Sequence, residues 1–215
     1  MTKIRKFAAK ALKYLFFPPA GRCPYCRDEM GDGSICKKCR KELRSYEIPF
    51  DTEAAFRARY FYFGIVRSIV MQFKFSGRTS LANNIARDML SLIRKDTDII
   101  TFVPLHEKRQ KARGYNQAEL IACELSKMTG IPVKPLIIRN RDTLAQSLID
   151  DYEERVKNVL DAFSPIEGAD IKGRKVVLVD DVVTTGATSN ECIKILFSLN
   201  ADRVEVVSFA AARGM

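Results

Sequence analysis

The stretch KVVLVDDVVTTGAT, residues 175–188, constrains the fold of this chain more than any other. It begins as a nearly continuous apolar run and then presents two adjacent carboxylates. Such runs are typical of strands in a parallel sheet that helices cover on both faces. From residue 53 onward, strand-like and helix-like segments alternate along the chain. This succession predicts an α/β fold, a doubly wound and mainly parallel sheet, over residues 50–215.

The spacing of the apolar residues gives the approximate positions of the elements. Strands are expected at residues 54–64, 98–105, 175–180 and 203–209, and helices at residues 65–77, 80–95 and 116–130 and in a segment that ends at residue 199. In the third helix, Asn116 and Glu119 resemble a capping box and Gly130 is a stop signal. A basic loop is expected between the second strand and this helix.

The loop that follows the two carboxylates has the composition of a phosphate cradle. Backbone N–H groups that lead into a helix N-terminus attract an anion, Thr184, Thr185 and Thr188 add hydroxyl donors, and Gly186 allows close approach. The carboxylates would repel a phosphate unless they face another part of the ligand, such as ribose hydroxyls, and Mg²⁺ can reduce the conflict. The pattern predicts a ribose 5-phosphate ligand. The alternative is that Asp-Asp only ends a strand and Thr-Thr-Gly only turns the chain.

Four of the six cysteines lie in CPYCRDEMGDGSICKKC as two Cys-x-x-Cys pairs, Cys23 with Cys26 and Cys36 with Cys39. Two such pairs supply the four thiolates that tetrahedral zinc requires, and a site with four protein ligands is structural. A redox-active pair normally follows a strand of a thioredoxin-like unit, which the sequence does not show, and a cytosolic chain disfavours disulfides. The segment therefore predicts a zinc ribbon or knuckle over residues 20–45.

The positive charge is concentrated near the start of the chain. Residues 1–44 hold 12 Lys and Arg against 4 Asp and Glu, in a chain whose net charge is +10, so a polyanionic partner is expected. Residues 1–19 predict a basic amphipathic helix, which either packs on its own protein or meets a partner, nucleic acid or a membrane surface. Lysines interrupt its apolar residues and no run reaches the length of a membrane span. A cytoplasmic protein with no transmembrane segment is expected.

Several blocks of the chain resemble, in the same order, the ComF (ComFC/GntX-like) family of competence-associated proteins. They are the four-cysteine knuckle, MQFKFSG, VPLHEKRQKARGYNQAELIA, RNRDTLAQSLIDDYEERVKNVLDAF and VVLVDDVVTTGAT. The last block is similar to the phosphoribosyl pyrophosphate (PRPP) motif of type I phosphoribosyltransferases. The resemblance implies the type I phosphoribosyltransferase fold with a small N-terminal zinc module, and PRPP with Mg²⁺ as the ligand.

The resemblance also implies roles for single residues. Asp180 and Asp181 contact the ribose hydroxyls. Arg139 and Arg141 neutralise the departing pyrophosphate, since residues 139–146 occupy the place of the flexible loop that closes over the reacting centre. For each arginine the alternative is a solvated surface role. The residues that wrap the 5-phosphate or bind the pyrophosphate are Thr184, Thr185, Gly186, Ala187, Thr188, Arg113 and Gly114, with Arg109 a weaker candidate.

Two functions from different classes follow. The resemblance and the basic N-terminal segment indicate a DNA-uptake accessory protein of natural transformation, which binds single-stranded DNA and PRPP beside a ComFA-like helicase or translocase and DNA-processing proteins. The alternative is an active phosphoribosyltransferase that uses PRPP and an unidentified nucleobase or other acceptor. Thr184 stands where purine-salvage members of the superfamily often carry a carboxylate that acts on the base, so the sequence leaves catalysis open. His106, the only histidine, is expected to be a loop residue without catalytic duty.

Overall fold

The computed structural model of the protein describes residues 21–28, 35–51, 53–143 and 151–212. The predicted helix at residues 1–19, the middle of the predicted knuckle and residues 144–146 of the predicted flexible loop fall outside these ranges. Within the described part of the chain, no helix is both long enough and apolar enough to cross a bilayer.

Four parallel strands form the central sheet. Their order is β1 (Phe56–Phe61), β6 (Arg203–Ala211), β5 (Lys175–Val183) and β2 (Ile99–Phe102). The helices between and after them are α3 (Gly64–Phe75), α4 (Leu81–Met89), α5 (Glu107–Arg113), α6 (Gln117–Thr129), α7 (Tyr152–Val159) and α8 (Ala187–Ser198), with a 3₁₀ turn at Leu90–Leu92. The doubly wound, parallel α/β fold is confirmed.

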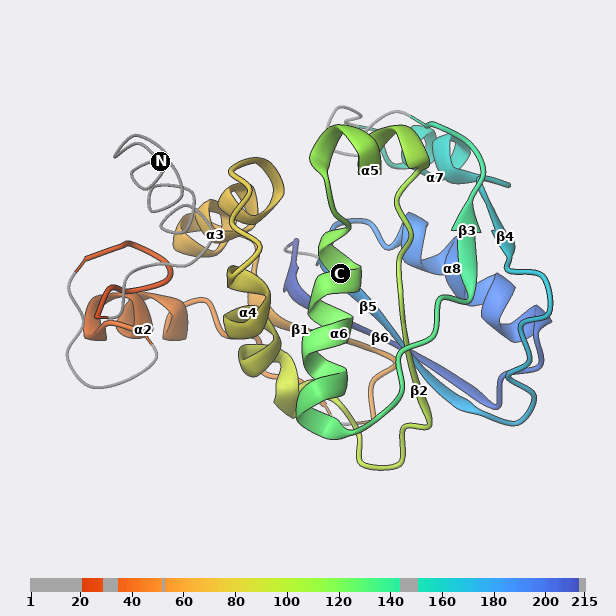
Figure 1. Cartoon of the computed structure of the whole chain (residues 1–215), viewed down its shortest axis with the longest axis horizontal. Coiled ribbons are helices and arrows are strands. Elements are labelled where there is room, and N and C mark those ends of the chain that lie inside the picture. The colour runs from red at the N-terminus through yellow and green to blue at the C-terminus, as the bar shows by residue number, and fades with distance from the viewer. Residues whose placement is uncertain (1–20, 29–34, 52, 144–150, 213–215) are drawn as a thin grey trace, which may run out of the picture.

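Helices cover the central sheet on both faces, as the apolar run of β5 predicts. Successive side chains of a strand point to opposite faces. Val177 and Val179 belong to a core that includes α3, α4 and α6, and Figure 1 shows α4 and α6 in front of the sheet. Val176 and Leu178 belong to the core beneath α8. Because both faces of β5 are buried in apolar cores, its sequence cannot alternate between polar and apolar residues.

Two features of the fold differ from the sequence expectation. The segment expected as a basic loop contains α5. The helix begins after His106, whose Nδ1 accepts a hydrogen bond from the backbone N–H of Lys108. It ends at Gly114, which has φ 86°. The second feature is a small antiparallel sheet of β3 (Ile137–Arg139) and β4 (Phe163–Pro165), which packs against α8. Strands of three residues carry too little periodicity to be found from the sequence.

The cysteine segment packs directly on the α/β domain. Its helix α2 (Lys37–Arg44) follows the second cysteine pair, and Cys23, Cys39 and Leu43 are buried in the same core as Val66 and Ile69 of α3. Two polar contacts join the same surfaces. The Tyr25 hydroxyl donates to Asp88 Oδ2 at 3.0 Å, and the buried Arg78 guanidinium donates to the carbonyl of Pro24.

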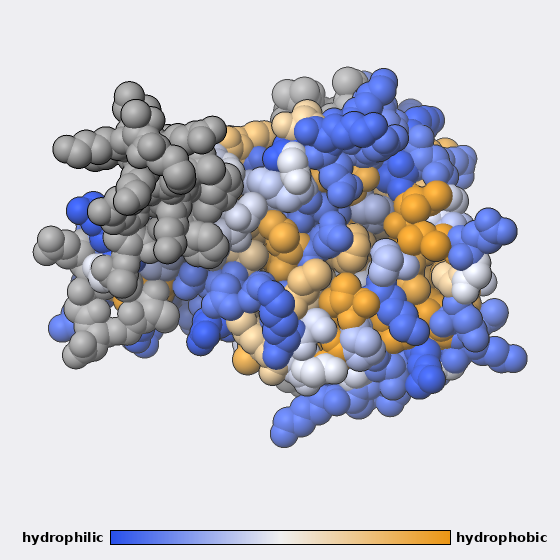
Figure 2. Space-filling view, viewed as in Figure 1, coloured by the Kyte–Doolittle hydropathy of each residue, from blue (hydrophilic) through white to orange (hydrophobic). Residues whose placement is uncertain are grey.

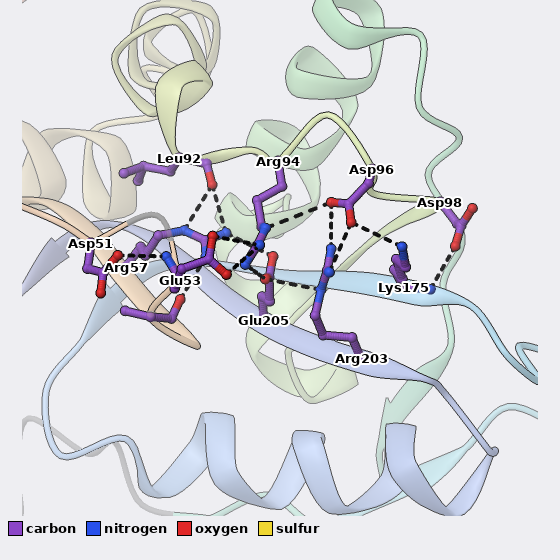
Figure 3. A network of polar contacts seen from close by, with 11 residues as sticks. Asp51, Glu53, Arg57, Leu92, Arg94, Asp96, Asp98, Lys175, Arg203 and Glu205 are labelled. Carbon is purple, nitrogen blue, oxygen red and sulfur yellow. Dashed lines mark hydrogen bonds and ion pairs between the residues drawn. The ribbon is translucent and has the colours of Figure 1, made fainter.

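A network of charged side chains lies at the amino ends of the strands (Figure 3). Its centre is the buried pair of Arg57 on β1 and Glu205 on β6, 2.9 Å apart. Arg94 joins Glu205 at 3.0 Å, and Asp96 accepts from Arg203 at 2.6 Å. This edge of the sheet is therefore occupied by charges that satisfy one another, and it is opposite to the edge at which α/β sheets bind ligands.

Candidate functional site

A pocket of about 310 Å³ opens at the carboxyl ends of the strands. The end of β5 forms its floor, and α3, the segment after β2, α6, β3 and α8 contribute its walls. The predicted site residues that line it are Asp180, Asp181, Thr184, Thr185, Gly186, Ala187, Thr188, Arg109, Arg113 and Arg139. The fold thus gathers residues from four separate segments of the sequence at the edge where such sheets bind ligands.

The two adjacent carboxylates face different surroundings because neighbouring strand residues point to opposite faces. Asp181 is buried and lies on the side of α3. Asp180 is half-buried and feels the charge of Arg139. Burial and the negative charge of Asp181 raise the pKa of Asp180 above its usual range. The backbone N–H of Asp181 donates to Asp180 Oδ1 at 2.8 Å, which fixes the orientation of that carboxyl.

Lys74, at the end of α3, is the positive partner of Asp181. Its Nζ lies 2.9 Å from Asp181 Oδ2, and the two side chains are 24% and 10% exposed. Burial opposes the charge of this lysine, but Asp181 and then Asp180 outweigh it and raise the pKa of Lys74. The pocket therefore contains an ammonium group that stays charged at neutral pH, bound to one of its two carboxylates.

The loop from Thr184 to Thr188 leads from β5 into α8 and forms one wall of the pocket. Gly186 is the N-cap of α8 and has φ 74°, a left-handed conformation that side-chain-bearing residues rarely adopt. Gly186 offers no side-chain cap, and the Ala187 N–H has only a long 3.5 Å hydrogen bond, to Thr185 Oγ1. The first backbone N–H groups of α8 and the threonine hydroxyls thus form an anion site at the positive end of the helix dipole.

A second group of donors lies across the pocket, at the start of α6. Gln117 is 2% exposed, and its Oε1 accepts from Arg113. The Nε2 of Gln117 is buried without a hydrogen-bond partner among the described residues. Asn116 is also buried; its Oδ1 accepts from the N–H groups of Ala118 and Glu119, which confirms the predicted cap. An unpartnered buried donor is costly, so a ligand acceptor at this wall would remove the cost.

Arg139 supplies another unpartnered donor from β3. Its guanidinium lies 5.2 Å from the centre of the Phe163 ring, one of its terminal nitrogens donates to Thr143 Oγ1, and its Nε is buried without a partner among the described residues. Burial and then the charge of Arg109 lower the pKa of Arg139 to about 10. It is therefore still charged at neutral pH, and an anion in the pocket would stabilise that charge.

Three residues that the sequence analysis singled out do not line this pocket. Arg141 donates to the carbonyls of Asn158 and Leu160 at 3.1 and 2.7 Å and does not line the pocket. Gly114 is an exposed helix end outside the lining. His106 lies in the loop just before α5 and caps that helix, and its Nδ1 is 3.8 Å from Asp142 Oδ1. The surface over α5 is strongly hydrophilic, as Figure 2 shows.

Sequence reasoning missed Lys74 and Gln117 as residues of the pocket. Both belong to blocks that stand out in the sequence, MQFKFSG for Lys74 and RGYNQ for Gln117. For Lys74 the signal was a charged side chain between two phenylalanines at a helix end, whereas the polar stretch around Gln117 carries no comparable signal. Only the packing of α3 and α6 against the end of β5 brings the two side chains to the carboxylates.

The four cysteines of the N-terminal segment form a cluster that fits a tetrahedral zinc ion. Their Sγ atoms all lie within 4.8 Å of one another, and those of Cys26 and Cys36 are 3.6 Å apart. Tetrahedral Zn–S bonds of about 2.3 Å place sulfur atoms roughly 3.8 Å apart. Backbone N–H groups of Cys36 and Cys39 donate to the sulfurs of Cys23 and Cys36, which favours thiolates. Zinc would cross-link the two Cys-x-x-Cys turns when bound.

The carboxylate pair fits Mg²⁺ less directly. Asp181 already has an ammonium partner, and Asp180 is oriented by a backbone N–H group. Mg²⁺ keeps several waters and is commonly held through substrate phosphates as well as carboxylates. The arrangement therefore suits an ion that arrives with a polyphosphate ligand.

Comparison with known proteins gives three findings. Residues 134–214 match the model of the phosphoribosyl transferase domain family. The chain is 28% identical over 225 residues to competence protein F from Haemophilus influenzae, covering 89% of this chain and 97% of that protein. It is 34% identical over 194 residues to DNA utilization protein YhgH from Salmonella typhi, covering 86% and 81% of the two chains.

Among solved structures, glutamine PRPP amidotransferase from B. subtilis, complexed with ADP and GMP, aligns at 23% identity with a TM-score of 0.44. The alignment covers 64% of this chain but only 30% of that chain. The assignment of the type I phosphoribosyltransferase fold depends instead on the family model and on the parallel strand order.

Proposed function

Because the chain belongs to the ComF family and carries a phosphoribosyltransferase domain, we propose that it binds PRPP in the pocket at the end of β5 and handles single-stranded DNA during natural transformation. The family membership supports a competence or DNA-utilization role. The identity of the ligand as PRPP and the binding of single-stranded DNA go beyond this family role and are the content of the proposal.

The observation that carries the PRPP part is the arrangement of donors around the carboxylate pair. The N-terminus of α8 opens on one side of the pocket, and the unpartnered donors of Gln117 and Arg139 lie on others. Asp180 and Asp181 lie between them at the end of β5. A ligand with phosphate groups at both ends and hydroxyls in the middle satisfies this order of donors and acceptors.

In this proposal each part of the pocket has one task. Thr184–Thr188 and the α8 N-terminus bind the 5-phosphate, the carboxylates accept hydrogen bonds from the ribose hydroxyls, and Arg113 with Arg139 binds the pyrophosphate. Mg²⁺, when bound with the ligand, reduces the repulsion between pyrophosphate and carboxylates. These tasks hold and orient the ligand, whether or not a reaction follows.

Calorimetric titration with PRPP and Mg²⁺ tests the placement. Asp181→Asn and Thr185→Val should each lower the affinity by roughly tenfold or more, because a hydrogen bond to a charged group contributes about 1.5–3 kcal/mol. Asp202→Asn, on an exposed carboxylate outside the pocket, is the matched control and should bind as the wild type does. Equal affinity in all four proteins would refute the site.

The DNA part of the proposal is supported by unpaired charge on α2. This helix carries five cations and one glutamate. Lys37, Lys38, Arg40, Lys41 and Arg44 are exposed, and none forms an ion pair with a described residue. Lysines and arginines release counterions when they meet a polyphosphate, so a strip of unpaired cations favours a nucleic-acid strand.

Catalysis remains the second candidate function, and Arg139 is the observation that favours it. A charged, half-buried arginine with a free Nε in the pocket is placed to stabilise a departing pyrophosphate. Pyrophosphate release from PRPP, measured with a panel of nucleobases, tests this function. Release that depends on one base and falls in Arg139→Gln would establish a transferase; no release with any base leaves ligand binding as the role of the pocket.

A further inference from the structure

Lys74 places a cation beside the carboxylate pair at which the proposed ligand would bring Mg²⁺. Its ammonium lies 2.9 Å from the buried carboxylate of Asp181 and lines the same pocket. The lysine comes from α3, which precedes β5 by about a hundred residues in the chain, so its place depends on tertiary packing and not on a local motif. The neighbouring Phe73 is fully buried and anchors this end of α3, and its carbonyl accepts from the Tyr115 hydroxyl.

The charges that face the pair come from several elements. Asp180 and Asp181 lie at the end of β5, Lys74 comes from α3, Arg113 from α5 and Arg139 from β3. Of these, only Lys74 forms a direct ion pair with a carboxylate of the pair among the described residues. The ammonium thus cancels one of two adjacent negative charges and fixes the position of Asp181.

We propose that Lys74 is a resident counter-ion, a positioning residue that holds Asp181 in place and prevents the Asp180–Asp181 pair from binding a divalent cation without its ligand. In consequence Mg²⁺ enters this pocket only as a complex with PRPP. The statement about PRPP rests on the proposed function, whereas the statement about the carboxylates and a bare cation does not.

The physical reason is competition for the same oxygens. Mg²⁺ requires octahedral oxygen ligands at about 2.0–2.1 Å and gives up its waters reluctantly. The Lys74 ammonium already forms an ion pair with Asp181 Oδ2 at 2.9 Å, and its charge would repel an incoming dication. PRPP that arrives with Mg²⁺ already bound avoids this repulsion, because its phosphates shield the ion. The ligand then needs from the carboxylates only acceptors for its ribose hydroxyls.

The first test uses Mn²⁺ alone, followed by electron paramagnetic resonance, so that no PRPP is involved. The full-length zinc-loaded protein should bind Mn²⁺ weakly, and Lys74→Met should bind one Mn²⁺ per chain at least tenfold more tightly. A misfolded or merely destabilised variant would not gain a metal site. Lys74→Arg should behave as the wild type. Equal Mn²⁺ affinity in wild type and Lys74→Met would overturn the inference.

The second test measures the affinity for PRPP with Mg²⁺ in the same proteins. Lys74→Met should lose roughly tenfold to a hundredfold, because Asp181 is then no longer held in place for the ribose hydroxyls and a cation bound at the pair competes for its oxygens. Lys74→Arg should restore most of the affinity. The matched control is Lys127→Met, which breaks a 2.6 Å ion pair with Glu124 on α6, outside the pocket. A loss in Lys127→Met as large as that in Lys74→Met would count against a specific role.

The two tests separate the failure of this inference from the failure of the proposed function. If the wild type does not bind PRPP but Lys74→Met gains Mn²⁺, the proposed ligand is wrong and the counter-ion role stands. If PRPP binds to the wild type and neither Mn²⁺ nor PRPP affinity changes in Lys74→Met, the pocket is correct and the role of Lys74 is wrong.

Discussion

Gly186 is expected to matter both for the backbone conformation at the start of α8 and for the close approach of a ligand phosphate. Its φ of 74° is strained for any residue with a side chain, and it caps the N-terminus of α8 in the pocket. Gly186→Val should therefore reduce PRPP affinity by at least tenfold and also lower the thermal stability. Gly168→Val, at φ 73° outside the pocket, is the control for strain alone. Calorimetry that shows the same PRPP affinity in both variants would contradict the cradle.

Asp96 is a residue whose contribution should depend on pH. Hydrogen bonds from Arg203 and Lys175 hold the pKa of this exposed carboxyl well below its usual value of 3.8 (Figure 3). A carboxyl whose pKa is lower in the folded than in the unfolded chain stabilises the fold above its usual pKa and loses that contribution as the pH falls. Asp96→Asn should therefore melt a few degrees below the wild type at pH 7. The difference between the two melting temperatures should start to shrink as the pH falls below about 4 and should vanish only as the pH falls through the lower pKa of the folded state; a constant difference would contradict the ion-pair account.

At the scale of elements, α2 is the surface on which the DNA proposal depends. Replacing Lys37, Lys38, Arg40 and Lys41 with Ala should make the slope of log affinity for single-stranded DNA against log salt shallower by about 0.7 per lost contact, roughly 3 in all. PRPP affinity should hardly change, because none of the four residues lines the pocket.

A control variant separates the α2 surface from total charge. Lys134, Lys157, Lys172 and Lys194 are exposed and lie outside α2, so their joint replacement with Ala removes the same charge. This control should keep most of the wild-type salt slope. If instead the α2 variant keeps its slope, the DNA surface lies elsewhere, and Arg109, Lys111 and Arg113 on α5 are the next residues to replace.

The elements also show which parts of the fold could be predicted from the sequence. Strand β5 and helix α6 were predictable because a long apolar run and a capping residue encode them locally. The β3–β4 pair was not, since strands of three residues have no measurable period and depend on contacts with α8. Within the pocket, the carboxylates and the threonine loop formed a local motif, whereas Lys74 needed the packing of α3.

At the scale of the whole molecule, the cysteine segment and the α/β domain share one core. Cys23, Cys39 and Leu43 are buried against α3, and the Tyr25–Asp88 hydrogen bond joins the segment to α4. The same helix α3 carries Lys74 to the pocket. A metal bound by the four thiolates should therefore stabilise the complete chain, because its binding free energy becomes folding free energy.

Metal removal tests this coupling. A chelator, or Cys36→Ser, should lower the melting temperature by several degrees in a single calorimetric transition and weaken PRPP binding through α3. Cys123→Ser, on a half-buried cysteine of α6 outside the cluster, should leave the metal content unchanged. Two separate transitions, with the second at the wild-type temperature, would show that the segment and the domain unfold independently.

The central claim is that the pocket at the end of β5 binds PRPP, and a crystal structure of the protein with PRPP and Mg²⁺ tests it most directly. The account predicts the 5-phosphate at Thr184–Thr188 and the N-terminus of α8, the ribose hydroxyls on Asp180 and Asp181, and the pyrophosphate near Arg113 and Arg139. It also predicts that Lys74 stays beside Asp181. PRPP bound at another surface, with this pocket empty at saturating ligand, would contradict the account.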